Sequence, residues 1–469
     1  MGNRKSIALV SLGCAKNAVD LQLMAGRMLA DGCVLSPDPD RADVVIVNTC
    51  SFIASAREEA EAEISRALYL KQRGNYGEVI VAGCYPQRYP EAKGRFPGVD
   101  EWLGVPKGWE EQRVPGLRLT GRAFAYLKIA EGCSHKCAYC AIPAIRGPFR
   151  SRPMDSILAE AKTLVESGCR ELNIVAQDPM IWRDKGQGPR AKGQGGEEGI
   201  GVRVKGQGSR DEGQGPRAKG QGGEEGQGPR AKGQGGEEGQ GPRVKGRGKG
   251  IADLLWALDE LDGDYWVRVL YSYPHEITDG FLDWMNRSKH AVKYIDVPLQ
   301  HTVPEVLERM NRAAAIEATR SASERLRSAV PGVTLRTTIM TGFPGETERR
   351  FQMMLDDLRR MRFDRLGAFA FSPEAGTAAE KMSGRPPRRV AEEREREVMK
   401  VAKSIWREKA RGMIGKTFRA LVVAPNVARM ESQAPDVDGV VNVATDAVGE
   451  FVDVRLEKVR GFDFEGVVV

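Results

Sequence analysis

Short apolar runs alternate with helical patterns along most of the chain, and this alternation limits the possible folds more than any other feature. In the first 110 residues the runs are Ile7–Leu12, Val44–Val47 and Val79–Ala82, and the intervening helical patterns end near Leu29 and Tyr69. Apolar strands that are separated by helices form parallel sheets with helices on their faces. We therefore predict an α/β chain that begins with a doubly wound parallel sheet.

A cysteine follows each of these three runs, at Cys14, Cys50 and Cys84. The carboxyl ends of parallel strands open on one edge of the sheet, where ligands bind. A single cysteine at such a position often serves as a small buried hydrophobic residue. Three cysteines that each follow a strand favour a shared ligand. The chain has 8 Cys and starts without the apolar stretch of a secretion signal. We therefore expect a cytoplasmic protein that uses its cysteines for metal binding or catalysis instead of disulfides.

Three further cysteines, Cys133, Cys137 and Cys140, form a CxxxCxxC motif after the apolar run Ala125–Ala130. Structural zinc sites have four protein ligands, often in two CxxC pairs, and no second pair follows this motif. Three thiolates on a four-iron cubane would leave one iron open for a substrate. Zinc remains the alternative, with His135 as a possible fourth ligand, although we expect His135 to face solvent.

A CxxxCxxC motif with an aromatic residue, Tyr139, before its last cysteine resembles the radical S-adenosylmethionine (SAM) superfamily. With three strand-end cysteines upstream, the chain is similar to the methylthiotransferases of that superfamily. The resemblance is also carried by Ser11–Asp20, Asn48–Ile53, Arg146-Gly147, Arg150–Arg152, Val297–His301 and Gly342–Glu346. It covers nearly the whole chain outside residues 185–250, and it departs from the family at Pro179-Met180, where two threonines are usual.

The resemblance implies two 4Fe–4S clusters and SAM as cofactors. The CxxxCxxC cysteines would hold the cluster whose open iron chelates SAM, and the three strand-end cysteines would hold a second cluster that carries sulfur. One-electron reduction would cleave SAM to a 5′-deoxyadenosyl radical that takes hydrogen from an unactivated carbon. A flavodoxin- or ferredoxin-like reductant and a sulfur donor are implied as partners, and no side-chain acid or base is indicated.

Six strand candidates, each followed by a helical pattern, resemble the partial (β/α)6 barrel of radical SAM enzymes. They are Ala125–Ala130, Glu171–Gln177, Trp266–Ser272, Tyr294–Leu299, Thr334–Thr341 and Leu366–Phe371. Chemistry in such barrels lies at the carboxyl ends of the strands. The candidates for SAM contact there are Tyr139, Gln177, Arg268, Gln300, Gly342, Gly345 and Glu346.

Each of these candidates also has a structural interpretation. The glycines of the Gly342–Glu346 turn would bring backbone amides and a helix N-terminus to the SAM carboxylate, or they could form only a tight strand-to-helix turn. Arg268 and Gln300 could serve only the loop backbone, and Tyr139 could simply pack within its loop.

A 13-residue tandem repeat, GQGPRAKGQGGEE, occupies residues 186–198, 213–225 and 226–238. The tract 185–250 holds 24 of the 54 glycines and a net charge of +6, so the rest of the chain, at +1, is nearly neutral. Its lack of apolar residues predicts a disordered insertion. Because it follows the strand-end pair Gln177-Asp178, it is either a tolerated loop or an electrostatic contact to ribosomal RNA.

The tail follows a long helix through Met413 and contains the short strand runs Phe418–Val423, Gly439–Val443 and Phe451–Leu456. This pattern resembles the small, OB-like β-barrel of TRAM substrate-binding domains. Residues 412–469 carry a net charge of −3, whereas a tRNA-reading domain should be basic. An acidic tail suits a basic ribosomal protein better.

Within the family we therefore expect the branch that methylthiolates the β-carbon of an aspartate in ribosomal protein S-twelve of the small subunit. The branch that modifies an adenosine in tRNA is the alternative, and a zinc-bound binding module without catalysis is an alternative of another class. The expected domains are 1–118 with the first cluster, 119–412 with the barrel and the insertion 185–250, and 413–469 with the TRAM fold. No apolar run is long enough to span a membrane.

Overall fold

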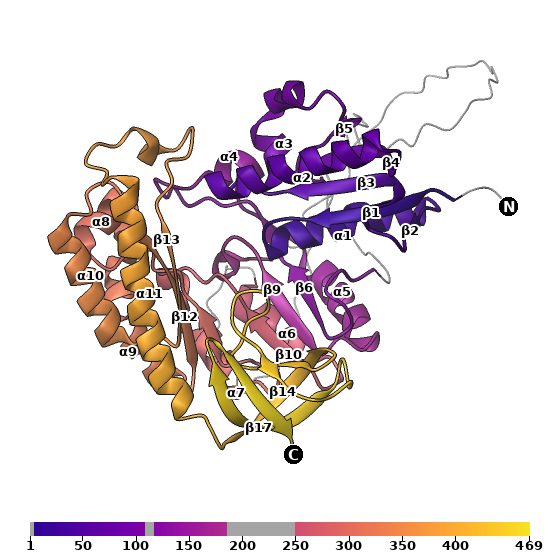
Figure 1. The fold of residues 1–469 in the computed structure, drawn as a ribbon. Helices are drawn as coiled ribbons and strands as arrows, with labels where there is room; N and C mark the ends of the chain where they lie inside the picture. The colour runs from indigo at the N-terminus through magenta and orange to yellow at the C-terminus, as the bar shows by residue number, and fades with distance from the viewer. Residues whose placement is uncertain (1–3, 108–116, 185–248) are drawn as a thin grey trace, which may run out of the picture. The chain divides into compact units, whose positions relative to one another are not determined.

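A computed structural model describes residues 4–107, 117–184 and 249–469, so the repeat tract and its expected disorder lie outside the described residues. The chain begins with a five-stranded parallel sheet in the order β2-β1-β3-β4-β5 (Figure 1). Its elements are β1 (Ser6–Ser11), α1 (Ala15–Ala30), β2 (Val34–Leu35), β3 (Ala42–Thr49), α2 (Ala54–Gln72), β4 (Tyr76–Gly83), α3 (Cys84–Arg88) and β5 (Glu101–Trp102). The predicted doubly wound sheet is confirmed.

The second part of the chain is a set of parallel β/α units. Its strands are β6 (Phe124–Lys128), β9 (Glu171–Val175), β10 (Trp266–Val269), β11 (Tyr294–Asp296), β12 (Thr334–Thr341) and β13 (Arg365–Ala370). Its helices are α4 (Ile142–Arg146), α5 (Met154–Glu166), α6 (Ile251–Asp259), α7 (Asp279–Arg287), α8 (Pro304–Arg309), α9 (Ile316–Ala329) and α10 (Glu348–Met361). A short hairpin of β7 (Ala130–Glu131) and β8 (Arg150–Ser151) flanks the CxxxCxxC loop.

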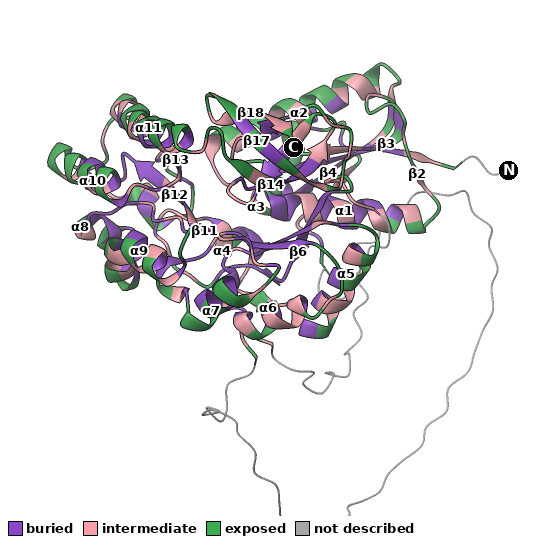
Figure 2. Ribbon diagram, turned by 90° about the horizontal axis from the view of Figure 1, so that it is seen from below, coloured by how far each residue is buried: buried purple, intermediate pink, exposed green. Residues whose placement is uncertain are grey.

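All six expected strands form, and they pair in two three-stranded sheets, β10-β9-β6 and β11-β12-β13. A parallel bridge links Val267 of β10 to Ala291, three residues before β11. Figure 2 shows β6 in the buried colour, and every residue of β6, β9 and β10 is buried. Helices pack on one face of these strands, and on the other face Tyr126 and Trp266 pack with Ala15 of α1 and Leu421 of the C-terminal tail. Burial on both faces explains why the strand sequences read as continuous apolar runs.

The tail folds into a closed barrel in the order β14-β15-β16-β18-β17. It follows α11 (Arg388–Arg411) and consists of β14 (Thr417–Ala424), β15 (Val427–Met430), β16 (Val441–Asn442), β17 (Phe451–Arg460) and β18 (Asp463–Val468). The expected small β-barrel is confirmed, although the sequence pattern missed β15 and β18. Among the described residues, no helix has the length and apolarity that a membrane span requires.

Candidate functional site

Cys14, Cys50 and Cys84, the N-terminal triad, follow three neighbouring strands, β1, β3 and β4. The side chain of Asn17, in the first turn of α1, ties these strand ends together. Its Nδ2 donates to the carbonyl oxygens of Leu12 (3.1 Å) and Thr49 (2.9 Å), and its Oδ1 lies 3.5 Å from the sulfur of Cys84. One amide therefore contacts the ends of all three strands.

The strand ends also approach one another too closely for ordinary side chains. Gly13 has φ +91°, and a Cβ there would lie 2.7 Å from the Cβ of Cys50. Gly83 has φ +97°, and a Cβ there would lie 2.4 Å from Oδ1 of Asn48. Glycine fits both demands because it lacks a Cβ and adopts positive φ at low cost. The backbone thus brings three distant thiols to one sheet edge, as predicted.

The three thiols differ in their readiness to ionise. Desolvation opposes the thiolate at Cys14, but the positive charges of Lys16 and Arg146, together with hydrogen bonds from the backbone, outweigh it and lower the Cys14 pKa. At Cys84 burial dominates and raises the pKa to about 12, and burial also raises the pKa of Cys50. Because a metal centre binds thiolates, Cys14 is the first ligand that this edge would offer.

Cys133, Cys137 and Cys140, the CxxxCxxC triad, lie in one loop that backbone hydrogen bonds hold. The amide of Cys133 donates to Gly147 O (3.1 Å), and that of Ala138 donates to Met310 O (2.9 Å). Gly132, at φ +75°, lies so close to Pro148 that a Cβ would be 2.2 Å from its carbonyl oxygen. The loop is therefore fixed by the segments on either side of it.

Both triads consist of thiols alone, the ligand type that iron–sulfur clusters use. Burial raises the pKa of Cys133 to about 11 and that of Cys140 to about 12, so binding of a metal centre would have to displace their protons. Within residues 4–107, 117–184 and 249–469, no three His, Cys, Asp or Glu side chains converge on a single-ion site.

The loops that carry the two triads both contact the strand-end segment Tyr271–Tyr273, which the sequence analysis did not single out. The ammonium of Lys16, two residues after Cys14, lies 3.6 Å from the ring centroid of Tyr271. The hydroxyl of Tyr273 lies 3.6 Å from the sulfur of Cys137. Tyr271 has φ 71°, a left-handed backbone that is uncommon outside glycine. The only signal in the sequence is a pair of aromatic residues directly after a strand.

His135 does not face solvent as expected. Its Nε2 lies 2.6 Å from Oδ2 of Asp178, and its ring stacks on Tyr273 with centroids 4.2 Å apart. The strand-end aspartate and the aromatic ring hold the imidazole against the loop, so the side chain is only 20% exposed.

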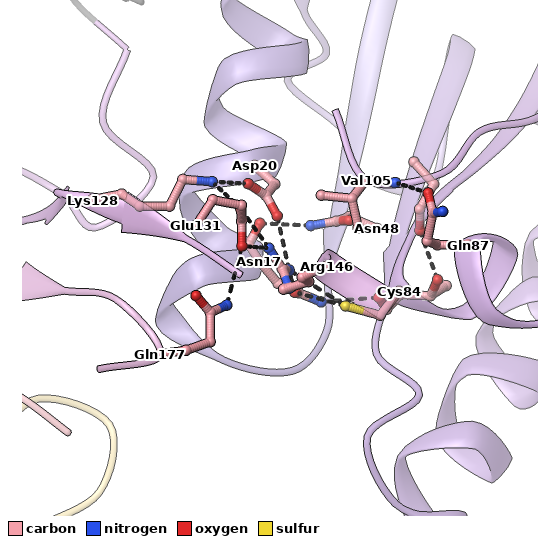
Figure 3. Close-up of polar contacts among 12 residues, drawn as sticks. Asn17, Asp20, Asn48, Cys84, Gln87, Val105, Lys128, Glu131, Arg146 and Gln177 are labelled. Carbon is pink, nitrogen blue, oxygen red and sulfur yellow. Dashed lines mark hydrogen bonds and ion pairs between the residues drawn. The ribbon is translucent and has the colours of Figure 1, made fainter. Parts of the chain in front are cut away.

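A buried ion network joins the loops of the two triads (Figure 3). Arg146, six residues after the last CxxxCxxC cysteine, pairs with Asp20 (2.9 Å) and Glu131 (2.9 Å) and donates to Cys84 Sγ (3.4 Å). Lys128 contacts the same two carboxylates at 2.5 and 2.8 Å. All four ionic side chains are at most 2% exposed. Lys128 and Arg146 outweigh burial and lower the pKa of Glu131, so the carboxylate is charged.

A second buried arginine stands beside the CxxxCxxC triad. Arg312 donates to the hydroxyl of Tyr139 (3.3 Å) and to Pro298 O (3.0 Å), and its guanidinium lies 3.9 Å from the ring centroid of Tyr273. Its Nη1 is 4.0 Å from Cys137 Sγ. In the described part of the chain it contacts no carboxylate. The sequence analysis missed Arg312, which follows α8 without any motif around it.

The structure brings Tyr139 to the Gly342–Glu346 turn, where its ring meets Phe343 edge-on at 6.3 Å. The glycines of this turn are explained by packing. A Cβ at Gly342 would lie 2.2 Å from Ala391, and one at Gly345 would lie 2.6 Å from Arg309. The Gly342 amide already donates to Glu346 (2.9 Å). This corrects the expectation that these amides stand open to a ligand.

The remaining candidates separate into two groups. Gln177 and Gln300 lie at strand ends, and the Oε1 of each is buried without a hydrogen-bond partner among the described residues. Arg268 is corrected, because its Nε pairs with Glu171 (2.7 Å) and its Nη1 donates to Glu431 O (2.7 Å), directly after β15 of the C-terminal barrel. These two partners, the first residue of β9 and the barrel, hold its side chain away from the carboxyl ends of the strands.

Comparison with known families accounts for most of the chain. Residues 6–104 match the Uncharacterized protein family UPF0004, residues 127–204 and 248–358 match the Radical SAM superfamily, and residues 414–469 match the TRAM domain.

Several curated relatives share the name "Ribosomal protein uS12 methylthiotransferase RimO". The relative from Moorella thermoacetica is 36% identical over 98% of this chain and 99% of its own. That from Opitutus terrae is 33% identical over 97% and 95% of the two chains. That from Geobacter sulfurreducens is 32% identical over the full length of both.

Proposed function

The chain belongs to the RimO family of radical SAM methylthiotransferases, and from this premise we propose that it methylthiolates ribosomal protein uS12 (S-twelve) at the β-carbon of an aspartate. The observation that carries the proposal is the contact of the two cysteine-bearing loops with one strand-end segment, Tyr271–Tyr273. Lys16 of the first loop contacts Tyr271, and Cys137 of the second contacts Tyr273. A radical SAM enzyme that transfers a sulfur group requires two such centres near one substrate.

We assign a 4Fe–4S cluster to each triad, with the open iron of the CxxxCxxC cluster as the SAM site. When bound, these groups supply the one-electron chemistry that breaks a C–H bond and the sulfur that replaces the hydrogen, while the protein supplies orientation.

The side chains around the CxxxCxxC triad suit a charged, polar cofactor. Arg312 offers a buried guanidinium, and Tyr139 offers an aromatic face next to the Gly342–Glu346 turn. Gln177 and Gln300 offer buried amide oxygens that lack partners in the described structure. Buried polar atoms of this kind are expected to pair with a ligand.

The proposed partners follow from the charge of the chain and from the reaction. The acidic C-terminal barrel, with a net charge of −3 over residues 412–469, suits a basic ribosomal protein or the assembled small subunit. A flavodoxin- or ferredoxin-like protein would supply electrons, a sulfur donor would reload the N-terminal triad, and the reaction would take place in the cytoplasm.

The test is an anaerobic assay with the reconstituted full chain, SAM, a chemical reductant and sulfide. Small ribosomal subunits and total tRNA from cells that lack the enzyme serve as parallel substrates. We expect mass spectrometry to find a methylthio group on one aspartate of uS12 and unmodified tRNA. A reconstituted chain with about eight irons fits two cubanes, whereas modification of tRNA alone would refute the proposal.

A further inference from the structure

Lys16 is a buried cation without a carboxylate partner, directly beside the N-terminal triad. It is the second residue of α1, and it is 9% exposed. Its ammonium lies over the ring of Tyr271, 3.6 Å from the centroid. Within the described part of the chain the ammonium makes no ion pair with a carboxylate and no hydrogen bond. A buried charge is costly unless it is paired, so contact with the ring alone leaves part of this cost uncompensated.

Lys128, the neighbouring buried lysine, is by contrast paired with two carboxylates. Lys128, 2% exposed, contacts Asp20 at 2.5 Å and Glu131 at 2.8 Å. Glu131 contributes to the electrostatic surroundings of Lys16, but Lys128 and Arg146 already share this carboxylate. Among the described residues, no carboxylate forms an ion pair with Lys16.

We propose that Lys16 binds the side-chain carboxylate of the substrate aspartate. This inference rests on the proposed function. The β-carbon of an aspartate is bonded directly to its carboxylate, so the anion must enter the site together with the carbon that receives sulfur. Lys16 lies two residues from Cys14, in the loop that would hold the sulfur-carrying cluster. A buried ammonium at this place pairs with the entering anion and fixes the β-carbon next to the sulfur.

Two other anions could compete for this ammonium. The SAM carboxylate belongs to the other triad, where Arg312 stands 4.0 Å from Cys137 without a carboxylate partner. In the described structure, each triad thus has a buried cation beside it that contacts no carboxylate, Lys16 at one and Arg312 at the other. The reaction brings two carboxylates to the site, that of the substrate aspartate and that of SAM. The second competitor is the N-terminal cluster, whose charge Lys16 would then simply balance. The experiment separates these roles.

The test measures binding without turnover. Reconstituted full-length chain, without reductant, is titrated with fluorescently labelled uS12 and with uS12 in which the target aspartate is replaced by asparagine. We expect the wild type to prefer the aspartate form. Lys16→Met, which keeps the length of the stem and removes the charge, should weaken binding of the aspartate form by about 10- to 100-fold, as expected for a buried charge-assisted hydrogen bond. Binding of the asparagine form should hardly change.

Two control variants isolate the charge at this position. Lys16→Arg should retain the preference for aspartate, and Lys93→Met, at an exposed lysine of the same N-terminal part, should behave as the wild type. Iron content and the electron paramagnetic resonance spectrum of each variant report whether both clusters load.

Three results would overturn the inference while leaving the proposed function intact. They are equal discrimination by wild type and Lys16→Met, a loss of SAM affinity in Lys16→Met, and a shifted spectrum of the N-terminal cluster with unchanged uS12 binding. Failure of the wild type to modify uS12 in the assay above would instead refute the proposed function.

Discussion

The N-terminal triad gathers its thiols from three strand ends, whereas the CxxxCxxC triad takes all of them from one short loop. The first depends on a sheet and on side chains that cross between elements, above all Asn17 and Arg146. The second is held by backbone hydrogen bonds, some within its own segment, such as Cys133 to Gly147, and one to the distant Met310. A motif search finds the second triad directly, but the first becomes visible only when the fold is predicted. The two sites should therefore also respond differently to damage.

The largest contrast is expected from removing one ligand at each triad. Cys50→Ala should abolish methylthio transfer but retain reductive cleavage of SAM to 5′-deoxyadenosine, whereas Cys137→Ala should abolish both. Each variant should lose about four of about eight irons. Chromatography of the SAM products and iron analysis measure these outcomes. If Cys50→Ala also stopped SAM cleavage, the triads would not have separate roles.

The next contrast concerns the buried arginine beside each triad. Arg146→Met leaves Asp20 and Glu131 with Lys128 alone, and breaking such a buried network costs about 3–5 kcal/mol of unfolding free energy. Arg312→Met strands no carboxylate in the described structure, so it should cost only about 1–3 kcal/mol.

Chemical denaturation of the apoproteins measures both effects. Arg388→Met, at an exposed helical position, is the control and should be close to neutral. Equal losses for Arg146→Met and Arg312→Met would show that the ion network does not distinguish the two triads.

The ion pairs of Glu171 allow a loss of overall stability to be distinguished from damage to the N-terminal triad. Glu171, the first residue of β9, pairs with Arg268 and Arg429 far along the strand from its carboxyl end. Burial opposes its charge, but the two arginines outweigh it and lower the Glu171 pKa. A lowered folded pKa adds stability above the ordinary pKa of glutamate, about 4.5, and this stability is lost as the pH falls through the folded value.

Wild-type stability should accordingly decline on acidification below about pH 4.5. Glu171→Gln should lose about 2–3 kcal/mol at neutral pH and show a flatter decline in acid. Denaturation at a series of pH values measures this difference. Iron loading of both triads should fall equally, if at all. A selective loss of iron from the N-terminal triad would contradict the separation between the two regions.

The order of strands and helices could be predicted from the sequence, because apolar periodicity and cysteine spacing are local patterns. Apolar runs located all six barrel strands and the strand ends that carry the N-terminal triad, and spacing located the CxxxCxxC triad. The small barrel was harder, since β15 has only four residues with an arginine among them, and β18 mixes acidic residues and a glycine with its apolar residues.

Side-chain partners across the fold were beyond sequence reasoning. Arg268 lies within a predicted strand, and only the structure shows that its side chain pairs with Glu171. Arg312 lies in no motif, and Lys16 was not singled out within the Ser11–Asp20 segment, because what distinguishes each is the lack of a carboxylate partner in the described structure. The left-handed backbone of Tyr271 and Gln300 is likewise set by tertiary contacts, since neither residue type favours it.

The smallest effect is expected from removing the repeat tract. The Asp184 amide donates to Lys249 O (2.8 Å), and Arg183 and Gly250 form an antiparallel bridge, so the two ends of the insertion already meet. Replacing residues 185–248 with Asn-Gly, a pair that suits a two-residue hairpin turn, should therefore leave both triads intact. Each halving of a flexible loop relieves about 0.6 kcal/mol of closure entropy, so the shortened chain should be slightly more stable.

Iron content, thermal unfolding and turnover on small ribosomal subunits at several salt concentrations measure the effect of the deletion. The tract carries a net charge of +6, so a turnover that falls on deletion at low salt only would instead assign it a contact with ribosomal RNA.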